Sequence, residues 1–196
     1  MLTSMKIIKF FLFILLLISN SSAFSQSNRF QMAVGGGVSF YPIRDFGENY
    51  FTQVAPEIVI YGYIPLFQRL WLRPGLRANY SWLQPEMPQA IRVEENDLKY
   101  DIEIGLVVDW IILPSISFGI GGIYRQISLK TQYPLVVPVD DVSGTDNIPM
   151  FQTQLGIGFP IASGIVVIEP YGRYVILEND KRFAWGYGLE VTMQIF

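Results

Sequence analysis

Eleven charged residues fall on the non-apolar side of segments in which apolar and other residues alternate. Two of them, Asp101 and Glu103, have the spacing that puts two carboxylates on one face of a strand, where they could act as general acid and base. Salt-bridge partners take the same spacing, and six acids here accompany five bases. We therefore predict first a network of ion pairs, in which Arg73 or Arg77 pairing with Glu103 or Glu169 is one hypothesis. The eleven are Glu57, Arg73, Arg77, Lys99, Asp101, Glu103, Asp109, Arg125, Glu169, Arg173 and Glu190.

Histidine and cysteine are both absent from the chain. Their absence removes Ser-His-Asp and Asp-His catalysis, thiol chemistry, disulfides and most metal sites. Asp140, Asp141 and Asp146 lie around Ser143 and Gly144, but their spacing does not fit an EF-hand calcium loop, so we interpret them as solvated acids. The sequence predicts no catalytic residue, no cofactor and no metal, and hence a protein that is not an enzyme.

The elements that carry the charged residues are predicted to be strands. Between residues 30 and 40 the even positions are mostly apolar and the odd ones mostly small or polar, which is the period of a strand. Seven further segments repeat this alternation, and their length suits tilted strands that cross a bilayer. These segments are residues 54–64, 70–82, 98–110, 117–125, 151–159, 165–175 and 183–195.

The size of the side chains indicates which face of the strands lies inside. One face carries large apolar residues such as Ile102, Leu106 and Trp110, and the other carries the charges together with glycine and alanine. The interior of an eight-stranded barrel is just wide enough for side chains, so the bulky face does not fit there. This argues against a soluble barrel of the lipocalin type. We predict an all-β, closed, antiparallel eight-stranded transmembrane β-barrel with its apolar face toward outer-membrane lipid.

The first 25 residues have the character of a secretory signal peptide. Lys6 and Lys9 accompany an apolar run of about a dozen residues, shorter than the ~20 that a membrane-spanning helix needs. Small and polar residues precede Gln26. We therefore expect a cleaved signal peptide over residues 1–25 and a barrel domain over residues 26–196. With 17 Asp and Glu against 14 Lys and Arg, the chain is acidic, and a nucleic-acid partner is not expected.

Connection lengths predict how the barrel is oriented. The connections near residues 65–69, 111–115 and 160–164 are short, and the others are longer, with residues 126–149 the longest. Short periplasmic turns and longer extracellular loops are typical of outer-membrane barrels, and both termini are then periplasmic. Pro56, Pro74 and Pro170 lie within strands, where we predict local bulges. Aromatic residues at both ends of the apolar rows predict interfacial girdles: Phe30, Trp71, Trp110, Phe118 and Phe159 at one end, and Phe40, Tyr80, Trp82, Tyr124 and Tyr174 at the other.

Four segments of the chain form distinctive motifs: Gly35-Gly36-Gly37-Val38-Ser39, Leu70-Trp71-Leu72-Arg73-Pro74-Gly75-Leu76-Arg77, Tyr100-Asp101-Ile102-Glu103-Ile104 and Ile168-Glu169-Pro170-Tyr171-Gly172-Arg173-Tyr174. These segments resemble the PorT-like outer-membrane β-barrel family, with general similarity to OmpA/OmpX-type barrels. The resemblance implies an eight-stranded barrel that the outer-membrane assembly machinery inserts, and some members serve in secretion or surface attachment. Phe196 resembles the C-terminal aromatic signal for that machinery, although the lipid-facing row ends at Ile195, so a terminal bulge or a frayed last residue is expected.

Three functions follow as expectations, in order of preference. The first is a non-enzymatic scaffold or surface-interaction protein, accessory to a secretion or envelope complex, whose lumen is filled by salt bridges. The second is a small passive pore for ions or small solutes, lined by the same charges. The third is a lipid-modifying enzyme that works without histidine.

Overall fold

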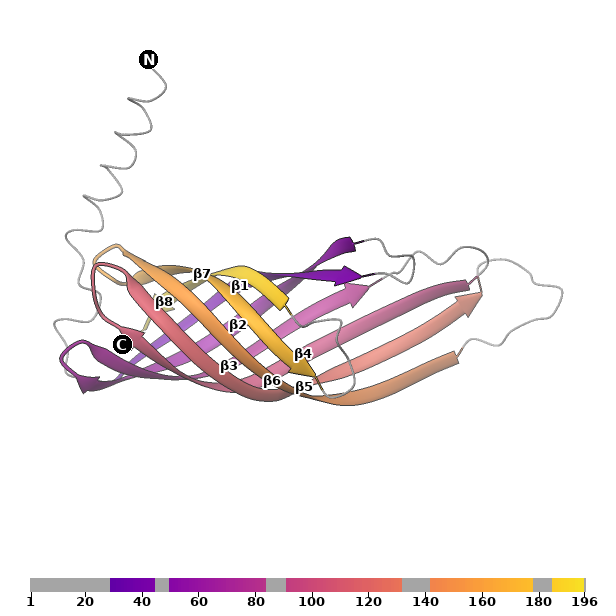
Figure 1. Ribbon diagram of the computed structural model, residues 1–196, viewed down its shortest axis with the longest axis horizontal. Helices are drawn as coiled ribbons and strands as arrows, with labels where there is room; N and C mark the ends of the chain where they lie inside the picture. The colour runs from indigo at the N-terminus through magenta and orange to yellow at the C-terminus, as the bar shows by residue number, and fades with distance from the viewer. Residues whose placement is uncertain (1–28, 45–49, 84–90, 132–141, 178–184, 196) are drawn as a thin grey trace, which may run out of the picture.

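The protein is described from a computed structural model, which covers residues 29–44, 50–83, 91–131, 142–177 and 185–195. These residues form eight β-strands (Figure 1). Within the part of the chain that is described, no helix is long and apolar enough to cross a membrane. The strands are β1 (Gln31–Arg44), β2 (Tyr50–Phe67), β3 (Leu70–Leu83), β4 (Ile91–Val108), β5 (Leu113–Thr131), β6 (Val142–Ile161), β7 (Val166–Leu177) and β8 (Trp185–Gln194).

The eight strands close into one antiparallel barrel in chain order. Each strand pairs with the next, and β8 pairs back onto β1, for example through Gly37 and Glu190. Closure leaves no sheet edge within the ring, which hydrocarbon would leave without hydrogen-bond partners. The fold class predicted from alternation is confirmed.

The strands extend farther beyond one end of the barrel than alternation predicts. At this end β5 continues to Thr131 and β6 starts at Val142, so most of the expected loop 126–149 is strand. β4 and β5 pair up to Ile91 and Thr131, whereas the described β6–β7 pairing reaches only Met150 and Leu177. We call residues 91–97, 125–131 and 142–149 of these three strands the extension, which projects past the other strands in Figure 1.

The opposite end of the barrel carries the turns at residues 68–69, 109–112 and 162–165. The start of β1 and the end of β8 lie at this turn end. The connections at the other end, which we call the loop end, fall at residues 45–49, 84–90, 132–141 and 178–184 and lie outside the described residues. Outside the described residues also lie the apolar segment at residues 133–138, Asp140, Asp141 and Phe196.

The bulges predicted at three prolines do not occur. Pairing between β2 and β3 is interrupted opposite Pro74 and resumes in the same register, and the β6–β7 pairing behaves in the same way opposite Pro170. At Pro56 the described β2–β3 ladder ends, with Glu57 its last paired residue on β2. A proline removes one N–H from a ladder, but it does not add the extra residue that defines a bulge. A register shift occurs instead beside the first turn, between Pro65 and Phe67.

Apolar side chains lie outside the barrel and charged ones inside. Ile102 is 67% exposed, whereas its neighbour Glu103 is 2% exposed. The same alternation runs along β7, whose buried residues alternate with exposed or half-buried ones. Since successive side chains of a strand point to opposite faces, the inward parity collects the charges and the outward parity forms an apolar belt.

Two apolar clusters lie inside the barrel, one toward each end. The turn-end cluster consists of Ala33, Val59, Tyr61, Tyr63, Trp71, Val107, Leu113 and Val167. The loop-end cluster consists of Tyr41, Ala55, Ile123, Ile148, Met150 and Val175, with Leu177 packed against it. The inward charges of the middle strand positions lie between these two clusters.

Candidate functional site: the charged lumen

All eleven charged residues singled out from the sequence are buried. Ten lie within strands and point inward, and Asp109 lies in the turn after β4. There the backbone N–H of Asp109 donates to the carbonyl oxygen of Arg69 at 2.8 Å. The strands thus bring together, inside one barrel, charges that are far apart in the sequence.

Arg77 on β3 is surrounded by three glutamates from three other strands. Its Nη1 lies 3.1 Å from Glu57 Oε1 and also donates to Glu190, while its Nη2 lies 3.3 Å from Glu103 Oε1. The side chains of Arg77, Glu57 and Glu190 have no solvent exposure. The Tyr61 hydroxyl accepts from Arg77 Nη2 and donates to Glu190 Oε1 at 2.9 Å. Arg77 therefore joins β2, β4 and β8 across the lumen.

Arg73 lies two inward positions from Arg77 toward the turn end and forms a two-point contact with Glu169 on β7. Its Nη1 lies 2.7 Å from Glu169 Oε2, and its Nη2 lies 3.3 Å from Oε1. Ser115 donates to the same carboxylate at 2.7 Å, and the Arg73 guanidinium lies 4.5 Å from the centroid of the Tyr61 ring. Paired donors of this kind match a carboxylate's geometry and give the strongest ion pairs.

Arg173 on β7 joins the network through Glu57. Its Nη2 lies 3.3 Å from Glu57 Oε2 and donates to Gln154 Oε1 at 2.8 Å. Glu57 also accepts from the Ser39 hydroxyl at 2.8 Å and from the Tyr171 hydroxyl. Glu57 thus links Arg77 to Arg173, so that the central ions form one connected set.

The remaining predicted charges lie nearer the loop end. Arg125 on β5 donates to both oxygens of Asp97, at 2.9 and 3.0 Å, and lies 2.9 Å from Glu95. The Lys99 ammonium lies 4.0 Å from the centroid of the Tyr41 ring. Asp101 accepts from the Gln152 side chain at 2.8 Å.

Glu95 and Asp97 are functional-site residues that the sequence reasoning missed. They share the parity of Lys99 and Asp101, but the predicted strand began at residue 98. With them the buried charges of the described residues comprise eight acids and five bases rather than six and five. The acids are Glu57, Glu95, Asp97, Asp101, Glu103, Asp109, Glu169 and Glu190, and the bases are Arg73, Arg77, Lys99, Arg125 and Arg173.

Inward tyrosines were also missed, and glycines make room for them. A Cβ at Gly188 would lie 2.3 Å from the Tyr171 hydroxyl, and one at Gly156 would lie 2.1 Å from Glu169 Oε1. Small inward residues therefore accommodate the long side chains opposite them, as the sequence suggests. The parity of Tyr61 and Tyr171 was the available signal, because each falls on the same side as the charges of its strand.

One residue predicted to lie in the aromatic girdle, Trp71, lies inside the barrel instead. Trp71 was predicted to be at the lipid interface, but it is 3% exposed and belongs to the turn-end cluster. The cause is its parity, since Trp71 shares the inward side of β3 with Arg73. At the loop end Phe40 stacks on Tyr187 and Tyr174 packs against Trp185, with centroids 5.4 and 5.1 Å apart.

The two carboxylates singled out as an acid and base pair do not share a partner. Asp101 and Glu103 both point inward but bind different partners, because Glu103 pairs with Arg77 and accepts from Ser117 at 3.2 Å. In the described part of the chain, no group of three or more His, Cys, Asp or Glu side chains has a geometry that could hold a metal ion. Outside, a belt of exposed apolar residues encircles the barrel, which is the surface of a transmembrane β-barrel.

Comparisons with known proteins add solved structures of similar fold. No family model matches the chain, and no curated protein matches it, so membership of the PorT-like family stays a prediction. Neisserial surface protein A (NspA) aligns with a TM-score of 0.48 and 7% identity over 83% of this chain and 95% of that chain. Ail, the attachment invasion locus protein of Yersinia pestis, aligns with a TM-score of 0.49 and 10% identity over 85% and 97%. At such identities the likeness concerns fold alone.

Proposed function

We propose that the chain is a non-enzymatic outer-membrane protein that works as a scaffold or surface-interaction protein, as an accessory to an envelope or secretion complex. The observation that supports this proposal is the buried ion network around Arg77, with an apolar cluster on either side of it, because a lumen filled in this way leaves the outer surfaces for function. Its partners are then outer-membrane lipid, the assembly machinery during biogenesis, and one envelope protein.

The two apolar clusters support a lumen that does not conduct. An ion that moves along the axis would have to pass the turn-end cluster, which includes Trp71 and Tyr63, and then the ion network around Arg77. Breaking that network leaves a buried ion unpaired, at a cost of about 3–5 kcal/mol. The loop-end cluster adds a further apolar layer.

The extension is the surface that we assign to partner contact. All residues from Ser143 to Asn147 are exposed, so neither face of this part of β6 is covered. Outward positions that are apolar at Tyr124 and Phe151 become polar at Gln126 and Asn147. This polar, paired sheet lies beyond the lipid belt. Because the turn end is predicted to lie in the periplasm, the sheet then faces the cell exterior.

Conductance measured across planar bilayers tests whether the lumen is filled. Purified protein should insert without discrete current steps under conditions in which an open barrel of similar size gives them. Regular openings from the wild-type protein would favour the passive pore instead. The variant Trp71→Ala, which thins the turn-end cluster, provides a sensitised control, and openings from it alone would support the assigned role of that cluster.

Affinity capture tests the role of the extension. A tag inserted within residues 132–141 should recover a stoichiometric envelope complex from native membranes. A matched variant with the same tag, in which the exposed Ser143, Thr145 and Asn147 are each changed to Lys, should insert equally well but lose the partner. Equal recovery by both proteins would contradict the assignment of the partner surface to the extension.

A further inference from the structure

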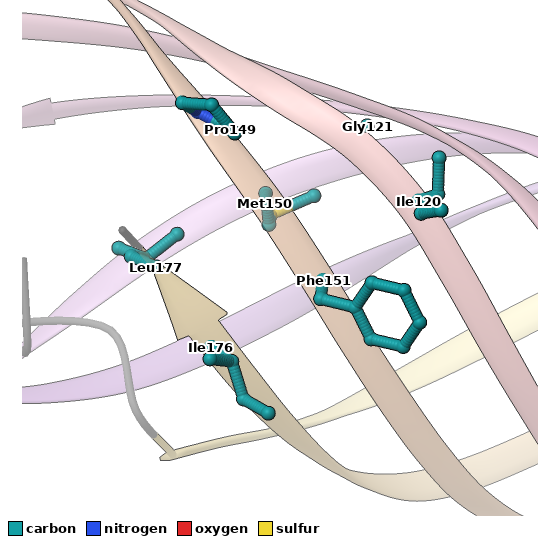
Figure 2. A pocket seen from close by; sticks show the side chains of 7 residues that line it. All are labelled: Ile120, Gly121, Pro149, Met150, Phe151, Ile176 and Leu177. Atoms are coloured by element: carbon teal, nitrogen blue, oxygen red, sulfur yellow. The ribbon is translucent and has the colours of Figure 1, made fainter. Parts of the chain in front are cut away.

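A pocket of about 500 Å³ opens on the barrel wall where β5, β6 and β7 meet near the loop end (Figure 2). Ile120, Phe151 and Ile176, one from each strand, are exposed on the outer face and line it. Pro149, Met150 and Leu177 complete most of the lining. Among the described residues that line this pocket, none is charged.

The pocket lies where the described pairing between β6 and β7 ends. The described pairing between β6 and β7 reaches Met150 and Leu177 at the loop end, and β6 then continues into the extension. Met150 is 4% exposed and belongs to the loop-end cluster, against which Leu177 packs. At this point the apolar interior of the barrel therefore reaches the outer surface.

The position of the pocket determines what can occupy it. Ile120, Phe151 and Ile176 belong to the apolar belt, and Asn147, the next outward residue of β6 beyond Pro149, is already polar. The pocket thus lies just inside the lipid boundary, where hydrocarbon is the material in contact with the wall. Its volume is within the range of about 300–1,000 Å³ that small-molecule sites occupy.

We propose that this pocket binds one acyl chain of a membrane lipid, held more tightly than the lipid that surrounds the belt. The inference rests on the membrane placement given under the proposed function. The chain lies against Ile120 and Ile176, with Met150 and Leu177 behind it. Van der Waals contact inside the concave pocket supplies the preference over surrounding lipid, because both environments are apolar and the described lining offers no charge to pair.

Photolabelling with a phospholipid that carries a diazirine in its acyl chain tests the site in reconstituted vesicles. Residues of one type keep the chemistry matched: Ile120 and Ile176 in the pocket are 62% and 55% exposed, whereas Ile58 and Ile60 on β2, away from the pocket, are 65% and 42% exposed. Simple contact with surrounding lipid predicts no more labelling in the pocket than outside. Bound lipid predicts labelling of Ile120 and Ile176 several-fold above Ile58 and Ile60, quantified by peptide mass spectrometry.

A space-filling variant makes the test specific. Ile176→Trp should lower labelling of Ile120 to the level of Ile58, while the matched variant Ile60→Trp should leave it unchanged. If Ile176→Trp does not fold, Phe151→Trp fills the same space from β6. Labelling of Ile58 and Ile60 without excess at the pocket would overturn the acyl-chain site alone. Absence of labelling at all four isoleucines would overturn the membrane placement itself.

Discussion

At the scale of single residues, the lumen shows how buried ions are kept paired. A guanidinium removed from water needs both opposite charge and acceptors for its hydrogen bonds. Arg77 receives three carboxylates, and the Tyr61 hydroxyl joins it to one of them. Because Glu57 also contacts Arg173, the loss of one ion affects partners on several strands.

The variant Arg77→Met should lower the free energy of unfolding by about 3–5 kcal/mol, because Glu57, Glu103 and Glu190 lose their shared cation. Equilibrium unfolding in urea from lipid vesicles measures this loss. The control Arg69→Met, at an exposed turn position, should change stability by no more than about 0.5 kcal/mol. Adding Glu190→Gln to Arg77→Met should restore part of the loss. Equal stability of the two single variants would contradict the role given to the network.

Gly121 supports a close approach of two backbones. A Cβ there would lie 1.9 Å from the carbonyl oxygen of Tyr100 and 2.6 Å from the Cα of Asp101. Gly121→Ala must separate β5 from β4 and should cost about 1–3 kcal/mol or more, measured by the same unfolding experiment. At Gly172 an added Cβ meets nothing within 4 Å, so Gly172→Ala should be neutral or slightly stabilising. Similar losses in both variants would contradict the role given to the close approach at Gly121.

At the scale of elements, each strand separates lipid-facing from lumen-facing residues. On β4 the outward row includes Leu98, Ile102 and Ile104, while the inward row carries Lys99 and Asp101. The difference in polarity between the outward and inward rows is strong only within the apolar belt. Beyond it the outward row turns polar at Asn96, although pairing with β5 continues to Ile91.

A lysine on the outward row of β4 should therefore have an effect that depends on depth. Ile102→Lys places an ammonium in the lipid belt and should reduce stability by about 2–4 kcal/mol. Asn96→Lys, on the same face of the same strand but near the polar boundary, should cost about 0–1 kcal/mol. Folding equilibria in vesicles give both values. Equal costs would mean that this face does not lie across a depth gradient of lipid.

The difference in polarity between the two faces determines how far the strands and the charged site could be predicted from the sequence. Alternation identified eight strands and the inward parity of charges such as Arg77 and Glu190, because the lipid belt makes the two faces differ. It placed the start of β4 too late and so missed Asp97, because both faces of β4 are polar over residues 94–97. It could not choose the partners of Arg77, since these depend on strand register and on the tilt of the barrel. The prediction that Trp71 lies at the lipid interface was wrong because it followed the residue type, whereas the parity of Trp71 is that of the inward Arg73.

At the scale of the whole molecule, the barrel divides into three zones along its axis. The turn-end cluster around Trp71 closes one end, the ion network occupies the middle, and the loop-end cluster lies below the extension. In the extension β5 is flanked by β4 and β6, whereas residues 143–147 of β6 pair with β5 and have no described pairing with β7. The zones should differ in local stability, because backbone hydrogen bonds with fewer neighbours open more readily.

Hydrogen exchange of the protein in vesicles should resolve this difference. Amides of residues 151–156, paired on both sides within the belt, should exchange slowest. Amides of residues 143–147 should exchange up to about tenfold faster than those of residues 125–128, because a hydrogen bond contributes about 0.5–1.5 kcal/mol and tenfold corresponds to about 1.4 kcal/mol. Both segments lie in the extension at matched height, so burial in lipid cannot account for a difference between them. Equally fast exchange in both would mean that the extension is not a paired sheet, and the surface that we assign to partner binding would then lack its framework.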